Sequence, residues 1–103
     1  MIAVSVFYPN QPGLHFDIHY YCEKHMPLVQ QLVGPGLVKV AVEQGIAGIE
    51  PGAPAPYLAI GRLYFESVDT FQKAAGPHFA KLAADVPNFT NANPIFQISE
   101  VKM

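Results

Sequence analysis

FDIHYYCEKHMPLV, residues Phe16 to Val29, has the spacing of an amphipathic helix and carries a proline near its end. At about 100° per residue, one third of the helix circumference forms an apolar stripe. Its members are Ile18, Tyr21, Cys22, His25, Leu28, Val29 and Leu32. Phe16 and Tyr20 are expected on the opposite side, among charged residues. The stripe therefore predicts a titratable ring, His25, on the buried face of a helix, with Cys22 as a small buried hydrophobe beside it.

Pro27 follows His25 by two residues and disturbs the helix at that point. It has no amide N–H for the carbonyl of Glu23, and it disfavours helical geometry at Met26. We expect a kink beside His25 and a free carbonyl that its imidazole can bond. Two interpretations stay open: His25 titrates in a chamber, or it is a core histidine hydrogen-bonded to a carbonyl.

The composition indicates one domain spanning residues 1–103, since domains of this size are common. Half of the residues are hydrophobic and 14% are charged, so the chain can bury a core and is expected to self-associate. A net charge of −2 gives no basic field for nucleic acid. Cys22 is the only cysteine, which excludes an intrachain disulfide and a paired zinc motif. The chain has no signal-peptide pattern and no apolar run of about 20 residues, so we expect a cytoplasmic protein without a membrane partner.

The order of elements predicts an α+β fold. Apolar, β-branched and aromatic runs predict four strands, at Ile2–Tyr8, Leu37–Ile46, Tyr57–Phe65 and Pro94–Val101. Helices are expected from Phe16 to about Val33, and from a Ser67 cap to about Val86 with an interruption at Gly76-Pro77. The order βαββαβ is ferredoxin-like: a four-stranded antiparallel sheet with both helices on one face.

Helices on one face leave the other face of the sheet uncovered. Both faces of the first and third strands look largely apolar, so we expect a second copy to cover the open face and close a barrel across a homodimer. The space between the sheet and its helices, or inside the shared barrel, is then a chamber for a small-molecule ligand. The long loop Gly45 to Pro56 is expected to border this chamber or the partner chain.

Several polar side chains are candidates for a site beside His25. The predicted catalytic groups are His25, Tyr21 and His78, the last at a helix start that favours its neutral form. The predicted substrate-binding groups are Tyr8, Tyr20, Arg62, Tyr64 and Glu43, with Asp85 and Asn88 as weaker candidates. Arg62 is expected to pair with Glu43, either as a substrate-orienting pair or as a structural bridge. Tyrosines are commonly packing groups, and His78 can equally be a surface residue. His15 is expected to precede the helix, and only His19 and Glu23 share its polar face, so no metal site is predicted.

The chain resembles the EthD family, which is named for a protein associated with bacterial degradation of ethyl tert-butyl ether. The similarity rests on the order of an N-terminal strand ending YPN, FDIHYYCEKHMPLV, VAVEQGIAG, PAPYLAIGRLYF, SVDTFQKAAGPH and NFTN. The resemblance implies a dimeric α/β barrel. Family members are linked to an ether-oxidising monooxygenase system, and the wider superfamily includes oxygenases, isomerases, lyases and haem-binding enzymes.

No flavin, nicotinamide or nucleotide motif is present, so we predict chemistry without a cofactor. Cofactor-independent acid–base chemistry, associated with oxidation, isomerisation or lyase activity, is the leading interpretation. One alternative is a non-catalytic accessory binding protein of a monooxygenase system. The other is a haem monooxygenase with iron held by a histidine such as His78.

Overall fold

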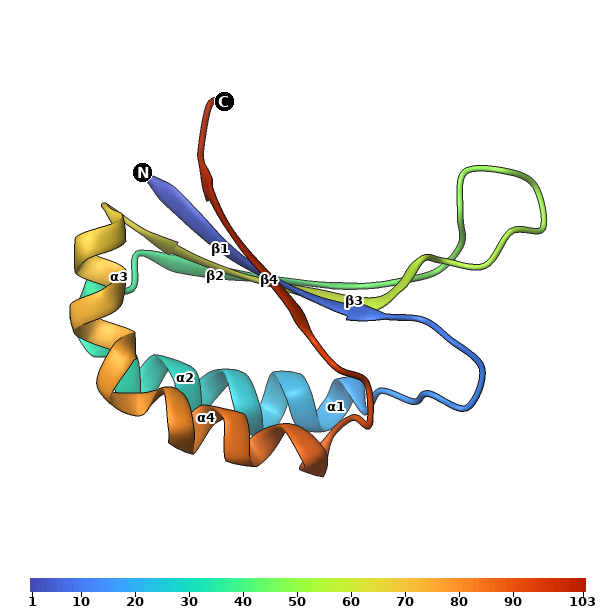
Figure 1. Ribbon diagram of the computed structural model, residues 1–103, viewed down its shortest axis with the longest axis horizontal. Helices are drawn as coiled ribbons and strands as arrows, with labels where there is room; N and C mark the ends of the chain where they lie inside the picture. The colour runs from blue at the N-terminus through green and yellow to red at the C-terminus, as the bar shows by residue number, and fades with distance from the viewer.

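The computed structural model describes residues 1–103 as an antiparallel sheet with helices packed on one of its faces (Figure 1). The strands are β1 (Ile2–Pro9), β2 (Lys39–Gln44), β3 (Tyr57–Phe65) and β4 (Ile95–Glu100), in the spatial order β2-β3-β1-β4. All three strand pairings are antiparallel. The predicted ferredoxin-like α+β fold is therefore confirmed.

Each helical segment is built from several short pieces. The first consists of α1 (Ile18–Tyr20), the π-helical turn η1 (Tyr21–His25), α2 (Met26–Val33) and the 3-10 turn η2 (Gly34–Gly36). The second consists of α3 (Val68–Ala75), η3 (Gly76–His78), α4 (Phe79–Asp85) and η4 (Val86–Asn88), where η3 and η4 are 3-10 turns. None of these helices has the length and apolar character that a membrane crossing requires.

Capping explains where the helices begin. The side chain of Asp17 accepts a hydrogen bond from the backbone N–H of Tyr20 at 3.0 Å, and the Ser67 hydroxyl accepts one from Thr70 N–H at 3.1 Å. Both satisfy amides that a helix start leaves unpaired. The predicted Ser67 cap is confirmed. The strand β2 is shorter than predicted at both ends, because Leu37 N–H bonds back to Gly34 and Ile46 is already exposed in the loop.

The turn before Pro27 differs from the regular helix that the spacing predicts. The N–H of Met26 bonds to the carbonyl of Tyr21, five residues back, so the chain forms a π turn at the point where a kink is expected. A wider turn moves the Glu23 carbonyl away from the ring of Pro27, with which it would clash in an α-helix. The extra residue also turns Cys22 outward, so its side chain is exposed and not buried as predicted.

The same turn changes which residues are buried. The buried positions of the segment are Tyr21, His25, Met26, Val29 and Val33. Leu28 and Leu32, expected on the buried stripe, are only half-buried. Phe16, expected on the side opposite the stripe, packs against the same core. It precedes the helix and forms an isolated β-bridge with Thr90, so helical periodicity does not govern its direction.

The two faces of the sheet differ in chemistry. The helix side carries alternate residues of β1, including Val4 and Tyr8, above the buried core. The open side carries Arg62, whose guanidinium lies 2.8 Å from the carboxylate of Glu43. It also carries Lys39, whose ammonium lies 4.7 Å from the centre of the Tyr64 ring. The expectation of a largely apolar open face was wrong, because Ser5 of β1 and Arg62 of β3 lie on this face together with polar residues of β2 and β4.

Candidate functional site

A cavity of about 300 Å³ lies between the helix side of the sheet and the helical segments. Fifteen of its eighteen lining residues are hydrophobic, including Val4, Met26, Val29, Leu63 and Phe71. No aspartate, glutamate, lysine or arginine lines it. A cavity of this size is at the small end of ligand sites, and its walls suit a small, mostly apolar molecule.

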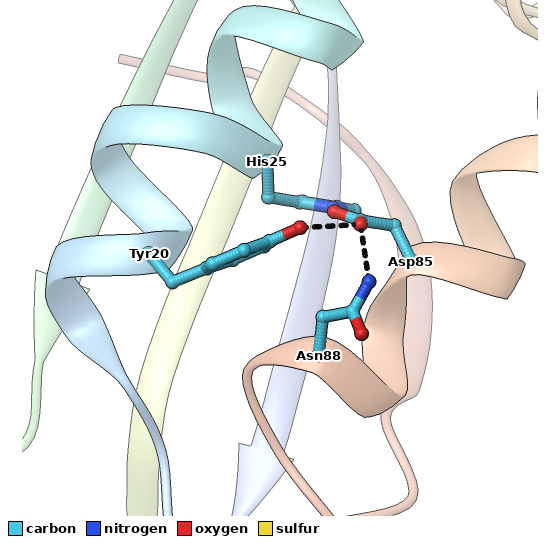
Figure 2. A network of polar contacts seen from close by, with 4 residues as sticks. All are labelled: Tyr20, His25, Asp85 and Asn88. Carbon is cyan, nitrogen blue, oxygen red and sulfur yellow. Dashed lines mark hydrogen bonds and ion pairs between the residues drawn. The ribbon is translucent and has the colours of Figure 1, made fainter.

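His25 is a lining residue of this cavity and is tied to a carboxylate from the other helical segment. Its Nδ1 lies 2.9 Å from Oδ2 of Asp85. Figure 2 shows that Tyr20 and His25 approach Asp85 from the first helical segment, while Asn88 approaches it from the turn that follows Asp85 in the second segment. The Tyr20 hydroxyl donates to Oδ1 of Asp85 at 2.7 Å, and the Asn88 amide donates to the same oxygen at 2.9 Å. The His25 and Asp85 side chains are 8% and 14% exposed.

The carboxylate fixes the tautomer of neutral His25. Because Asp85 only accepts, Nδ1 carries the hydrogen and Nε2 keeps its lone pair. Every fully buried side-chain nitrogen or oxygen in the molecule has a hydrogen-bond partner, whereas Nε2 of His25 has none. It therefore retains accessible surface, on a ring that lines the cavity. A ligand in the cavity can meet this nitrogen as a proton acceptor.

Asp85 is held as a carboxylate. Burial acts to raise its pKa, but the hydrogen bonds from Asn88, His25 and Tyr20 together bring the pKa below its ordinary value. The hydrogen bond to Asp85 has the opposite effect on its donor and raises the pKa of Tyr20. The Tyr20 hydroxyl and the Nδ1–H of His25 therefore both donate to the negatively charged carboxylate of Asp85.

Two buried tyrosines lie next to His25. The ring of Tyr21 stacks on the imidazole, with 5.4 Å between centres and 17° between planes. Tyr8 meets Tyr21 edge to face at 5.6 Å. Burial raises the pKa of Tyr21 to about 12, although a hydrogen bond with Tyr8 lowers it in part. Burial, with the neighbouring Tyr21, also raises the pKa of Tyr8 well above its ordinary value. Both stay neutral hydrogen-bond donors over the physiological range.

Phe89 holds these rings together. It is 1% exposed, and its ring lies 4.7 Å from that of His25 and 5.0 Å from that of Tyr21, centre to centre. Its backbone carbonyl accepts from Asp17 N–H at 2.7 Å, which ties the start of the first helical segment to the end of the second. The relative position of His25 and Asp85 depends on this contact.

Other predicted site residues lie elsewhere. His78 ends η3, and it does not line the cavity. The Arg62–Glu43 ion pair forms as expected, but it lies with Tyr64 on the open side of the sheet, away from the cavity. Tyr20 supports Asp85 and is not a lining residue.

The loop 45–56 does not line the His25 cavity. It extends beyond the end of the sheet on the side opposite the helices (Figure 1). The loop therefore does not border this cavity, and its place at a partner chain or a shared barrel stays a prediction. The imidazole of His25 also binds the carboxylate of Asp85 rather than a free carbonyl.

Sequence reasoning ranked Asp85 and Asn88 low and missed Phe89. Helical spacing relates residues of one helix, whereas Asp85 and Phe89 meet His25 across 60 or more positions of chain, and Asn88 bonds to Asp85. An acid at the end of α4, followed closely by asparagine and phenylalanine, was the available signal. It did not indicate which histidine the acid would face.

Comparisons with known proteins agree with the fold and identify the family. The family model described as the EthD domain matches residues 15–93. An uncharacterised 11.0 kDa protein of Rhodococcus erythropolis, from the thcB–thcC intergenic region, is 38% identical over 94 residues. That match covers 88% of this chain and 85% of the relative.

Solved structures extend the comparison. An EthD-like protein from Ralstonia eutropha JMP134 is 38% identical, with a TM-score of 0.94 over 99% of this chain and 92% of its own. SnoaB, a cofactor-independent oxygenase from Streptomyces nogalater, is 15% identical, with a TM-score of 0.58 over 99% of this chain and 92% of its own. The second similarity concerns the fold alone.

Proposed function

This chain belongs to the EthD family, and on that premise we propose that it binds a small, neutral, mostly apolar molecule and moves a proton at His25. The observation that carries the proposal is the His25–Asp85 pair at the wall of an otherwise apolar cavity. In this role Nε2 accepts a proton from the ligand, and Asp85 stabilises the imidazolium that forms. General acid–base transfer of this kind contributes roughly 10²–10⁴-fold to a rate.

The charges around the cavity define the ligand class. Asp85 is negative and no lysine or arginine lines the cavity, so a ligand that enters as an anion adds a second uncompensated charge. A neutral phenol, enol or enolisable ketone adds none, because its proton passes to His25 and the total charge is unchanged. Its oxygen can accept a hydrogen bond from Tyr21, which stays protonated. These features support a neutral ligand with one acidic O–H or C–H group.

Family membership supports a place in catabolic or oxidative metabolism. An enolate or phenolate is the electron-rich form of such a ligand, and SnoaB, with the same fold, is a cofactor-independent oxygenase. The second candidate function is a non-catalytic accessory protein of a monooxygenase system, which would use the same cavity and need no proton transfer. The apolar walls favour both, and the His25–Asp85 pair favours catalysis.

We also propose that the protein is a homodimer that uses the open side of the sheet. Large apolar side chains on that side and in the neighbouring loop are uncovered: Ile95 is 54% exposed, and Ile46 and Ile49 are 95% and 101% exposed. A second copy would cover them, and the polar groups of the same face would supply hydrogen bonds at the rim.

The test measures binding and proton transfer separately. Purified protein is titrated with naphthol, and deuterium wash-in at the α-carbon of tetralone, an enolisable bicyclic ketone, is followed by NMR. We expect saturable binding and accelerated exchange. The exchange rate should fall by 10²-fold or more in His25→Ala. His19→Ala, an exposed histidine of the same segment, is the matched control and should behave as wild type. Binding without exchange would support the accessory protein, and binding of neither probe would contradict both functions.

A further inference from the structure

Gly61 occupies a position where a strand normally carries a side chain. It lies in the interior of β3, paired with Val6 on one side and Val42 on the other. Its backbone is not in the left-handed region, which in this chain holds only Gly13, Gly34 and Gly52. Glycine weakens the interior of a strand and there often marks a close approach. Space, and not backbone conformation, is therefore the reason for glycine at this position.

The hydroxyl end of Tyr21 fills that space. A Cβ built on Gly61 would overlap the Tyr21 hydroxyl oxygen and lie 3.2 Å from Cζ of the same ring. Both residues line the His25 cavity. The absence of one side chain thus lets a phenol reach down to the backbone of the sheet.

Aromatic rings surround Tyr21 on several sides. Its ring lies 5.0 Å from those of Phe16 and Phe89 and stacks on His25, and the residue is 2% exposed. Cores this close-packed give way only with strain. A side chain at position 61 would push the ring away from the sheet, toward the imidazole and the cavity.

We infer that Gly61 is a positioning residue that determines specificity: its missing side chain sets the depth of the Tyr21 hydroxyl in the cavity, beside His25. This role rests on the proposed function, in which the cavity binds a small neutral molecule through one oxygen. The hydroxyl at this depth gives the cavity a hydrogen-bond donor at its polar end while leaving the rest of the volume to apolar atoms. The Gly61–Tyr21 pair therefore selects ligands that present an oxygen at that end.

A two-residue cycle tests the inference on the full chain. The variants are Gly61→Ala, Tyr21→Phe and the double variant, with Gly76→Ala as the matched control, since a Cβ at Gly76 meets nothing within 4 Å. Each is titrated with naphthol and with methylnaphthalene, which has no oxygen to accept a hydrogen bond from Tyr21, and each is melted. Gly61→Ala and Tyr21→Phe should each reduce the preference for naphthol over methylnaphthalene by roughly tenfold, the effect of losing one hydrogen bond. Gly76→Ala should leave the preference unchanged.

The double variant separates positioning from general damage. Tyr21→Phe removes the atom with which the new methyl group collides, so the double variant should melt higher than Gly61→Ala while its preference for naphthol stays low. Equal losses of affinity for both probes in Gly61→Ala, or no recovery of stability in the double variant, would overturn the role of Gly61. Wild-type protein that binds neither probe would instead overturn the proposed function, and the specificity role with it.

Discussion

Nδ1 of His25 lies 2.9 Å from Oδ2 of Asp85, although 60 positions of sequence separate the two residues. One comes from the π turn before Pro27 and the other from the last residue of α4. The contact joins the two helical segments at the wall of the cavity. It gives His25 one tautomer and one free nitrogen, on which the proposed chemistry depends.

Asp85→Asn should abolish proton transfer at His25 and weaken the fold. The amide is uncharged and can present either a donor or an acceptor to Nδ1, so it neither fixes the tautomer nor stabilises imidazolium. We expect a loss of about 1–3 kcal/mol in the free energy of unfolding, as for a largely buried hydrogen-bonded group that loses its partner. Chemical denaturation and deuterium wash-in would measure the two effects. Asp69→Asn removes an exposed carboxylate 3.0 Å from Lys73 and should change stability by no more than about 0.5 kcal/mol.

At acidic pH the free energy of unfolding should depend on the protonation of Asp85. The folded state lowers the pKa of this carboxyl below its unfolded value of about 3.9. The stabilisation is therefore complete above the unfolded pKa and is lost as the pH falls through the folded pKa. Unfolding free energies measured from pH 6 down to pH 2 for wild type and Asp85→Asn should converge below about pH 4. Parallel curves for the two proteins would contradict this assignment.

Helical and strand periodicity predicted most of the fold. The range of β3, the alternation of β2 and the Ser67 cap all follow from local patterns that the structure retains. The π turn does not follow from periodicity, because it adds one residue to a turn, which leaves Cys22 exposed and Met26 buried. The partners of His25 could not be predicted for a different reason. Asp85 and Phe89 come from a second helical segment, and the rotation of that segment about its axis depends on packing.

Tyr21 should resist deprotonation in alkaline solution. Burial raises its pKa to about 12, whereas an unfolded tyrosine titrates at about pH 10. Since the folded state favours the neutral phenol, its contribution to stability is complete below pH 10 and is lost as the pH rises toward 12. A near-ultraviolet titration of tyrosinate should show a delayed fraction that becomes smaller in Tyr21→Phe. An unchanged delayed fraction in that variant would place the buried phenol elsewhere.

Light scattering of dilute protein should give the mass of a dimer. A monomer would leave Ile95, Ile46 and Ile49 in water together with the open side of the sheet. Ile95→Lys should shift the mass toward the monomer, because it places a charge in the proposed interface opposite Phe7. Ile98→Lys is a control on the same strand, 44% exposed but on the helix side. Wild-type protein with a monomeric mass would contradict the dimer.

Hemin should not bind as a specific cofactor. Haem carries two propionates, and its sites supply cations or hydrogen-bond donors near the rim. The residues that line the cavity include no lysine or arginine. The two cations of the sheet are on the open face, where Arg62 pairs with Glu43 and Lys39 lies over Tyr64. His78, the predicted ligand in the haem alternative, is not a lining residue. Titration with hemin should therefore give no saturable Soret shift, and His78→Ala should leave the spectrum unchanged. A stoichiometric shift that is abolished by His78→Ala or His25→Ala would make haem chemistry the leading function, because it would identify that histidine as a ligand of the haem iron.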